Sequence, residues 1–270
     1  MPYSWGVIDQ LPIATVVLLC LAALLAGWID AVAGGGGIIQ LPALLIGLPP
    51  STPVATVSGT NKLSSIAGTA VASGRYLRKV RVHWPTALVV VGCGFIGSAI
   101  GARLVQLVPR TVFTPLIVVV VAVIGIYAWR RPQLGQANKD KLRTRTYWSL
   151  ALALGLVAGL WDGMVGPGTG VLLAVGFAAV LGYAFLEATT MAKLANLATN
   201  LAALIVLGRA GHVLWGLGAC MAACNLIGGA LGSGMAIRFG NRFIRVVLLV
   251  AVAIIEAKLV YDTVRLFLAA

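Results

Sequence analysis

Four charged side chains lie inside apolar segments and form two pairs with nearly the same spacing. Asp30 and Asp162 are 132 residues apart, and Lys62 and Lys193 are 131 residues apart. A charge at the centre of a bilayer costs about 2.5–3.5 kcal/mol, so such a residue indicates a task or a partner. Three roles fit each aspartate: proton or cation coupling, capping of exposed backbone donors, or solvation at a membrane interface. Each embedded ammonium requires an anion, which is either one of these aspartates or an oxyanion substrate.

A glycine-rich run follows each aspartate after three residues. The first run consists of Gly34, Gly35, Gly36 and Gly37, and the second contains Gly166, Gly168, Thr169 and Gly170. Glycine lets the chain leave one helix and begin another without a side-chain clash. Free N–H groups and the positive dipole end of the next helix would then form an anion site. The alternative is a turn at the bilayer interface or tight packing, but two runs at equivalent positions favour a substrate site.

Hydrogen-bonding residues surround both lysines. Asn61 directly precedes Lys62, and Asn196 lies three residues after Lys193, on the same face of a helix. The candidate substrate-binding residues are therefore the two glycine-rich runs, the two lysines, Asn61 and Asn196. The candidate proton-coupling residues are Asp30 and Asp162.

The same order of elements positions these residues in both halves of the chain. The expected elements are a long helix (11–33; 147–165), a short apolar segment (38–48; 171–181) and a lysine helix (53–73; 185–207), followed by two antiparallel spans. Each short segment has about 11 residues, roughly half a membrane crossing, which is typical of re-entrant or discontinuous half-helices. The sequence thus predicts two related transmembrane halves, residues 1–130 and 147–270, joined by a basic linker of residues 131–146.

Composition places the chain in a membrane. Of its 270 residues, 60% are hydrophobic and only 10% are charged, and the mean hydropathy is +1.00. Apolar stretches of spanning length occur at residues 11–33, 85–108, 111–129, 147–165, 213–237 and 243–260. About 20 such residues cross a hydrocarbon core of about 30 Å, so we expect an all-α polytopic membrane protein.

The formal net charge of +13 gathers in short loops beside these stretches, which marks the cytoplasmic side of a membrane and does not favour nucleic-acid binding. Loop 74–83 carries four basic residues and loop 103–110 carries two, whereas the equivalent loops 208–212 and 238–245 carry one and three. The first loop of the pair is the more basic one in the first half of the chain, whereas the second loop is the more basic one in the second half. We therefore predict an inverted repeat with a cytoplasmic linker.

The remaining motifs indicate packing and not catalysis. Residues 97–101 and 228–232 have the GxxxG spacing that lets two helix backbones approach closely, so we predict packing seams there. The four cysteines lie in apolar segments, and the two histidines lack metal-ligand spacing. With no catalytic triad, P-loop or zinc motif in the sequence, we expect no enzyme activity, no cofactor and no metal.

The whole chain resembles the TauE/SafE-type sulfite exporters, also called toluene sulfonate uptake permeases. The resemblance rests on residues 27–42, which read Gly-Trp-Ile-Asp, then four glycines, then Pro42; on the Asn61-Lys62 pair; and on a diverged second copy of both. In that copy Pro167 and Thr169 replace glycines. The resemblance implies a bacterial inner-membrane carrier with about eight spans. Its substrates would be small sulfur-containing anions such as sulfite, sulfonates or sulfoacetate.

Together these features predict a secondary transporter that is proton-coupled and works by alternating access around a site near the midplane. Its expected partners are a small sulfur oxyanion, protons and the lipid bilayer, and a homodimer is a further candidate assembly. Two other classes stay open, an anion channel and a non-transporting membrane scaffold or assembly protein. A channel would conduct without coupling, and a scaffold would not be stabilised by anions.

Overall fold

The computed structural model describes residues 11–108 and 144–268, and this part of the chain is helical, without a strand. Its elements are α1 (Ile13–Ala33), α2 (Gly37–Gly47), α3 (Val54–Leu77), α4 (Trp84–Leu104), the 3₁₀ turn η2 (Val105–Leu107), α6 (Arg145–Met164), α7 (Thr169–Val175), the π-helical turn η3 (Gly176–Val180), α8 (Phe185–Arg209) and α9 (Trp215–Leu268). These bounds lie close to the expected ones, and the predicted all-α class is confirmed.

Five helices within the two described ranges are long and apolar enough to cross a membrane: α1, α4 together with η2, α6, α8, and the Trp215–Gly240 part of α9. Their outer faces carry exposed apolar side chains such as Leu21, Ile96 and Leu156, as contact with lipid requires. The polytopic membrane class is confirmed. The expected span at 111–129 and most of the linker 131–146 lie outside the described residues.

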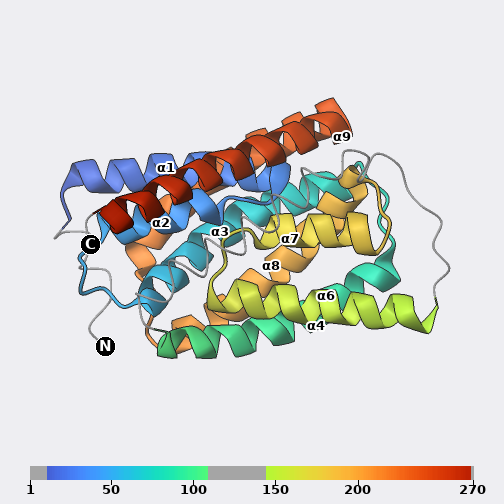
Figure 1. Cartoon of the computed structure of the whole chain (residues 1–270), viewed down its shortest axis with the longest axis horizontal. Helices are drawn as coiled ribbons and strands as arrows, with labels where there is room; N and C mark the ends of the chain where they lie inside the picture. Colours follow the sequence, from blue (N-terminus) through green and yellow to red (C-terminus); the bar gives the residue numbers. More distant parts are fainter. Residues whose placement is uncertain (1–10, 109–143, 269–270) are drawn as a thin grey trace.

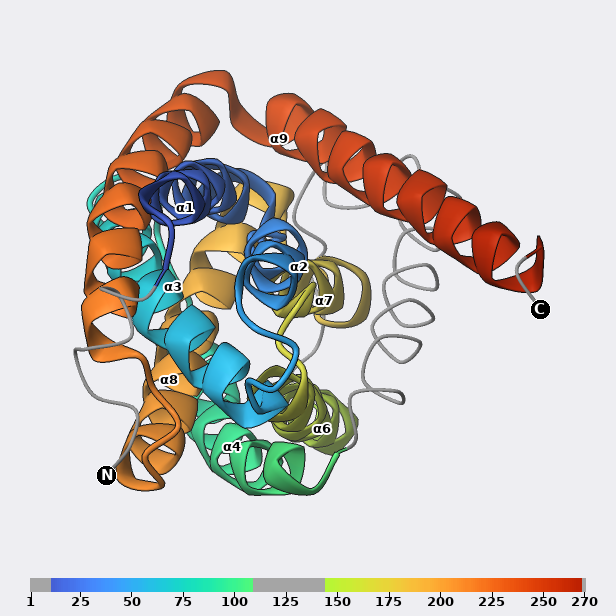
Figure 2. The same ribbon diagram turned by 90° about the vertical axis from the view of Figure 1, so that its left-hand side faces the viewer.

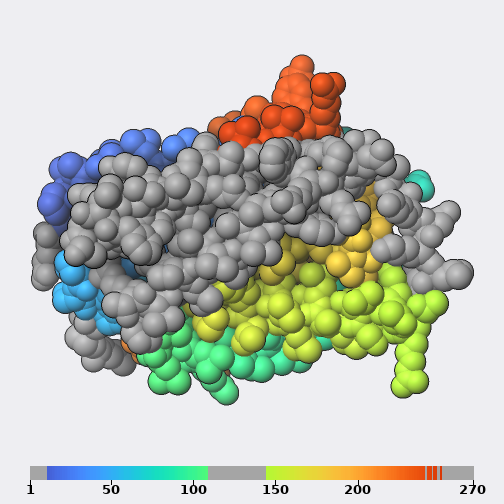
Figure 3. Space-filling model, viewed as in Figure 1, coloured from blue at the N-terminus to red at the C-terminus, as the bar shows by residue number. Residues whose placement is uncertain are grey.

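The long helices form a bundle with its most polar members in the middle. In Figures 1 and 2, α1 and α9 lie on one side, α4 and α6 on the opposite side, and α3 and α8 between them. Figure 3 shows α4 and α6 side by side along one edge of the molecule. Gly240, with φ 70° and ψ −160°, interrupts α9 and turns its last part away. Glycine adopts this conformation because it has no Cβ.

The two lysine helices, α3 and α8, run antiparallel. Near the start of α3, the Thr56 hydroxyl lies 3.2 Å from Nδ1 of His212, and the Thr60 hydroxyl accepts a hydrogen bond from the Leu214 N–H at 3.0 Å. His212 and Leu214 belong to the loop after α8. At the other end of α3, Tyr76 shares an apolar cluster with Leu186 from the start of α8. The loops that follow α3 and α8 therefore lie at opposite ends of the bundle.

Helix α3 is tolerated in a membrane because other helices enclose it. Its neighbours are α1, α2, α8 and α9. Its buried polar side chains are Thr56, Ser58, Thr60, Asn61, Lys62, Ser64, Thr69 and Ser73. The Thr60 and Thr69 hydroxyls donate to backbone carbonyls four residues earlier, which satisfies two of them within the helix. Polar groups in a bilayer are expected to face the bundle interior in this way.

The two GxxxG segments are packing seams, as predicted. Gly97 and Gly101 of α4 lie against the backbone of α6, and Gly228 and Gly232 of α9 lie against the backbone of α1. A Cβ at any of these positions would strike a carbonyl oxygen of the facing helix. Each seam thus joins a helix from one half of the sequence to a helix from the other.

Replacing Gly97 by alanine should lower the free energy of unfolding by about 1–3 kcal/mol, because the added methyl overpacks the contact between α4 and α6. Gly92→Ala is the matched control on the same helix. Nothing lies within 4 Å of its added Cβ, and alanine favours a helix over glycine by about 1 kcal/mol. Thermal unfolding in detergent, followed by tryptophan fluorescence, measures both. Equal melting temperatures of the two variants would contradict the seam.

Candidate functional site

The first helix break is built by backbone geometry that requires glycine. Helix α1 ends at Ala33 because Gly34 adopts the left-handed conformation with φ 87°, and the Gly34 N–H donates to the carbonyl oxygen of Asp30 at 2.8 Å. Gly36 is the N-cap of α2, which begins at Gly37 without a side-chain cap. The N–H groups of Ile38 and Ile39 donate to the carbonyls of Gly35 and Gly36 at 3.1 Å, so the first turn of α2 offers the break chiefly the positive end of the helix dipole.

The second break has the same parts but a shorter helix. Gly166 and Gly168 both have left-handed backbones, with φ 92° and 79°. The Thr169 hydroxyl donates to the carbonyl of Gly166 at 2.8 Å, and the Trp161 indole N–H donates to the carbonyl of Pro167 at 2.9 Å. Helix α7 has only seven residues before η3 continues it, compared with 11 in α2. The longer helix α2 is therefore better suited than α7 to attract an anion with its dipole.

The two breaks touch each other. The Val171 N–H donates to the carbonyl of Gly34 at 3.2 Å. A Cβ built on Gly34 would lie 2.7 Å from Cα of Gly170, and a Cβ on Gly170 would lie 2.5 Å from Cα of Gly34. Real contacts of Cβ atoms are never this short, so tight packing explains both glycines. This interpretation does not replace a substrate role, because both residues also line the cavity described below.

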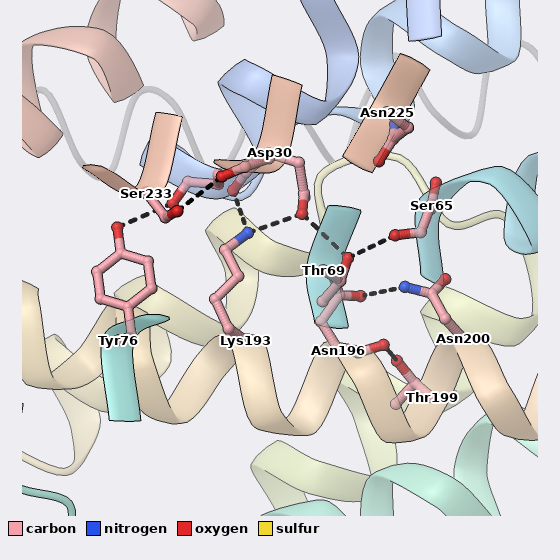
Figure 4. A network of polar contacts seen from close by, with 12 residues as sticks. Asp30, Ser65, Thr69, Tyr76, Lys193, Asn196, Thr199, Asn200, Asn225 and Ser233 are labelled. Atoms are coloured by element: carbon pink, nitrogen blue, oxygen red, sulfur yellow. Dashed lines mark hydrogen bonds and ion pairs between the residues drawn. The ribbon is translucent and has the colours of Figure 1, made fainter. Parts of the chain in front are cut away.

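One ion pair joins α8 to the end of α1. The Lys193 ammonium donates to Asp30 Oδ2 at 2.9 Å and to the backbone carbonyl of Asp30. The Thr69 hydroxyl lies 3.2 Å from the same Oδ2 and shares its one proton between this oxygen and the carbonyl of Ser65 at 2.8 Å. Figure 4 shows Lys193 and Thr69 converging on Asp30 from two helices. The side chains of Lys193 and Asp30 are only 1% and 13% exposed, so this is a buried, hydrogen-bonded pair.

The other ion pair joins α3 to the end of α6. The Lys62 ammonium lies 2.8 Å from Asp162 Oδ2, and both side chains are 2% exposed. The approach lacks the alignment of a hydrogen bond, and Oδ2 finds no other hydrogen-bond partner among the described residues. In both pairs, the lysine comes from one half of the sequence and the aspartate from the other. Burial of both aspartates shows that solvation at an interface is the wrong interpretation of them.

These groups surround one small cavity in the interior. Its lining consists of Asp30, Gly34, Gly37, Asn61, Lys62, Ser65, Asp162, Gly166, Gly170, Asn196 and Asn200. All of these are glycines or polar residues. The centre of a water-sized sphere can occupy about 20 Å³ of the cavity. A single ordered water requires at least about 10–15 Å³ by this measure, so the cavity holds little more than one water in this state.

Most of the residues predicted for the site line this cavity, and five do not. Those five are Gly35, Gly36, Gly168, Thr169 and Lys193. Gly36 instead packs against α1, where a Cβ would lie 2.7 Å from Cβ of Asp30. Gly168 and Thr169 shape the turn before α7. The Lys193 ammonium reaches the cavity only through Asp30, which it holds.

Sequence reasoning placed Asn200 on the polar face of the Lys193 helix but did not count it, or Ser65, among the site residues, although both line the cavity. Their signal is helical spacing, because Ser65 lies three residues after Lys62 and Asn200 four residues after Asn196. It also missed a second buried polar contact. The Asn225 side-chain amide donates to Gln40 Oε1 at 2.9 Å and to the carbonyl of Ala23 at 3.0 Å, and these bonds hold α9, α2 and α1 together. Gln40 and Asn225 lie in apolar surroundings and far apart in sequence, so no local pattern pairs them.

Apolar helices of spanning length around a buried, charged and glycine-lined cavity define a multi-pass membrane protein of the transporter class. Residues 19–259 match the model of one family, described as sulfite exporter TauE/SafE. The chain belongs to the TauE/SafE family. It is therefore a membrane transporter, and it is a multi-pass protein of the bacterial inner membrane.

Relatives with similar sequences agree with this assignment. A "Probable membrane transporter protein" of Haemophilus influenzae is 34% identical over 247 residues, covering 91% of this chain and 94% of the relative. The "Probable membrane transporter protein YfcA" of Escherichia coli is 33% identical, covering 91% and 90%. The more distant "Probable membrane transporter protein YdhB" of Bacillus subtilis is 25% identical, covering 90% and 96%. No solved structure matches the chain.

Proposed function

We propose that the protein carries a small sulfur-containing oxyanion, such as sulfite or a sulfonate, through the cavity between the two helix breaks. The observation that carries this proposal is the pair of buried lysine–aspartate contacts beside glycine-lined breaks. Two ammonium groups and the first turn of α2 supply positive potential, and amide and hydroxyl groups supply hydrogen bonds. The family description, sulfite exporter, supports a sulfur oxyanion as the substrate class.

Charge balance at the cavity favours proton coupling. The two lysines and two aspartates sum to no net charge, so an entering anion leaves a net negative charge in a buried place. Such an imbalance is costly where the dielectric is low. Protonation of Asp30 or Asp162 removes the imbalance and frees a lysine for the oxyanion. Anion and proton therefore bind together, which predicts movement of both in the same direction.

The small size of the cavity favours alternating access over a channel. An oxyanion has several heavy atoms, and the cavity admits little more than one water, so the breaks must separate for the substrate to enter. We further propose that residues 1–130 and 147–270 are inverted repeats that rock against each other around the cavity. The antiparallel α3 and α8, and ion pairs that each link one half to the other, support this arrangement.

Reconstitution into proteoliposomes tests the function. Uptake of sulfite, sulfate, thiosulfate, taurine or an aryl sulfonate should rise when an imposed pH gradient drives protons in the same direction. Uptake that ignores the gradient would indicate a channel. In detergent, the transported anion should stabilise the folded protein by about 2.7 kcal/mol at a hundredfold excess over its Kd. Absence of stabilisation by every anion would indicate a scaffold. A homodimeric assembly stays a prediction.

A further inference from the structure

We propose that the two lysine–aspartate pairs have different tasks. Lys62 takes the anion when Asp162 releases it, whereas Lys193 and Asp30 stay paired and hold the first helix break in place. This inference rests on the proposed function and deepens it, because it assigns the anion to one half of the cavity.

The Lys193 ammonium already makes hydrogen bonds to other groups of the protein. It has three N–H donors, and two of them go to the carboxylate and the backbone carbonyl of Asp30. That carbonyl also accepts the Gly34 N–H that closes the end of α1. The Asp30 carboxylate has a weaker second donor in the Thr69 hydroxyl, which shares its proton with the carbonyl of Ser65. Removing Lys193 from Asp30 would therefore disturb the C-terminal turn of α1, so this pair stays together and stabilises the end of that helix.

The Lys62 ammonium has fewer contacts with protein acceptors than the Lys193 ammonium. Within residues 11–108 and 144–268, its only ion pair is with Asp162 Oδ2 at 2.8 Å, and no backbone carbonyl joins this contact as it does at Lys193. Asp162 Oδ2 is itself buried without a hydrogen bond from the part of the chain that the structure describes. An ammonium has three N–H donors, and a single carboxylate oxygen leaves donors of Lys62 that a further acceptor can use. An oxyanion would satisfy these donors once a proton had neutralised Asp162.

The neighbours of Lys62 are also free to bind a ligand. Asn61 is 3% exposed and lines the cavity, and its Oδ1 is buried without a hydrogen-bond partner among the described residues. On the other lysine helix, Oδ1 of Asn196 accepts a hydrogen bond from Asn200 at 3.4 Å. An amide side chain without partners can present either its oxygen or its N–H groups, so Asn61 can donate to an oxyanion beside Lys62.

The backbone of both helix breaks also lies close to Lys62. A Cβ on Gly166 would lie 3.1 Å from the Lys62 ammonium, so the backbone of the second break lies close to this ammonium with no side chain between them. Gly37, the first residue of α2, approaches Gly166 closely, since its Cβ would lie 3.7 Å from the Gly166 carbonyl carbon. The start of the 11-residue helix α2, Lys62 and Asn61 thus face the same part of the cavity.

Among the described residues, the titratable members of the lining are Asp30, Lys62 and Asp162, and Lys193 reaches the lining through Asp30. The Tyr76 hydroxyl of α3 also lies near Asp30 and donates to the carbonyl of Ala31. Asp162 from α6 faces Lys62 from α3, and Asp30 from α1 faces Lys193 from α8. Asp162 takes up one proton as the anion arrives and gives it back as the anion leaves. Lys193 stays with Asp30 throughout, so that pair contributes no proton to the cycle.

Two aspartate variants test the inference through opposite results. Sulfite, with sulfate and thiosulfate in parallel, is titrated against the detergent-solubilised full chain, and affinity is taken from the melting temperature. Asp162→Asn should raise the affinity at neutral pH about tenfold and abolish its dependence on pH, because the competing carboxylate is gone. Asp30→Asn should give no gain in affinity and should keep the pH dependence.

Lysine variants provide a second test. Lys62→Gln should weaken binding about tenfold or more, because the charged donor to the anion is lost. The double variant Lys193→Gln with Asp30→Asn carries no charge at these two positions, and sulfite should still raise its melting temperature. If the variants at Lys62 and Asp162 changed the anion affinity no more than those at Lys193 and Asp30, this inference would be overturned while the proposed function stands. The same holds if only Asp30→Asn raised the affinity. If no anion stabilises the unmodified protein, the proposed function itself fails.

Discussion

Replacing Lys193 by glutamine should lower the free energy of unfolding by about 3–5 kcal/mol, because removal of one partner from a buried ion pair leaves the other charge uncompensated. Asp30 would remain buried, having lost its charged donor and keeping only Thr69. The carbonyl of Asp30 would lose the same ammonium where α1 ends. Chemical denaturation in mild detergent, followed by tryptophan fluorescence, measures this loss.

Adding Asp30→Asn to Lys193→Gln is the matched control. The double variant carries no buried charge at this pair and keeps side chains that can form hydrogen bonds, so much of the lost stability should return. A double-mutant cycle gives the coupling energy between the two residues. Independent, additive effects of the two substitutions would show that the ion pair does not act as a unit.

Replacing Gly34 by alanine should reduce anion transport about tenfold or more, because the breaks cannot approach each other with a side chain between them. The left-handed backbone of Gly34 disfavours alanine by about 1–2 kcal/mol. The new methyl would also collide with the backbone of Gly170, whose Cα lies 2.7 Å from the Cβ position. Uptake into proteoliposomes, normalised to the amount of correctly folded protein, measures the effect.

Gly35→Ala is the control from the same glycine run. Residue 35 has no left-handed backbone, and the atom nearest to its added Cβ is the end of the flexible Ile38 side chain at 3.2 Å. This variant should retain most of the transport. A loss as large as that of Gly34→Ala would mean that the whole run, and not the contact between the breaks, limits transport.

The contrast between Gly34 and Gly35 shows where sequence reasoning ends. The run of four glycines predicts a helix break, since glycine lowers the cost of leaving a helix. Neighbouring glycines are indistinguishable in the sequence, however, and their separate duties depend on what each faces. Gly34 meets Gly170 from a distant segment, Gly36 meets α1, and Gly37 meets Pro167.

The lysines show the same limit for charge. Burial of a charge inside an apolar segment predicts a functional or paired side chain, whatever the details of the fold. Equivalent positions in the sequence suggested equivalent tasks for Lys62 and Lys193. Only the structure shows that Lys193 donates to the backbone and the carboxylate of Asp30, while Lys62 has only an unaligned contact with Asp162.

By itself, the sequence determined that this protein is helical and lies in a membrane, where its helices break and which charges are embedded. These properties follow from hydropathy, helix length and the local conformations that glycine permits, all of which act over short stretches of chain. The tertiary structure decided which lysine meets which aspartate, which glycines touch and which residues line the cavity. Those contacts join residues 100 or more positions apart, and their geometry depends on how the helices pack.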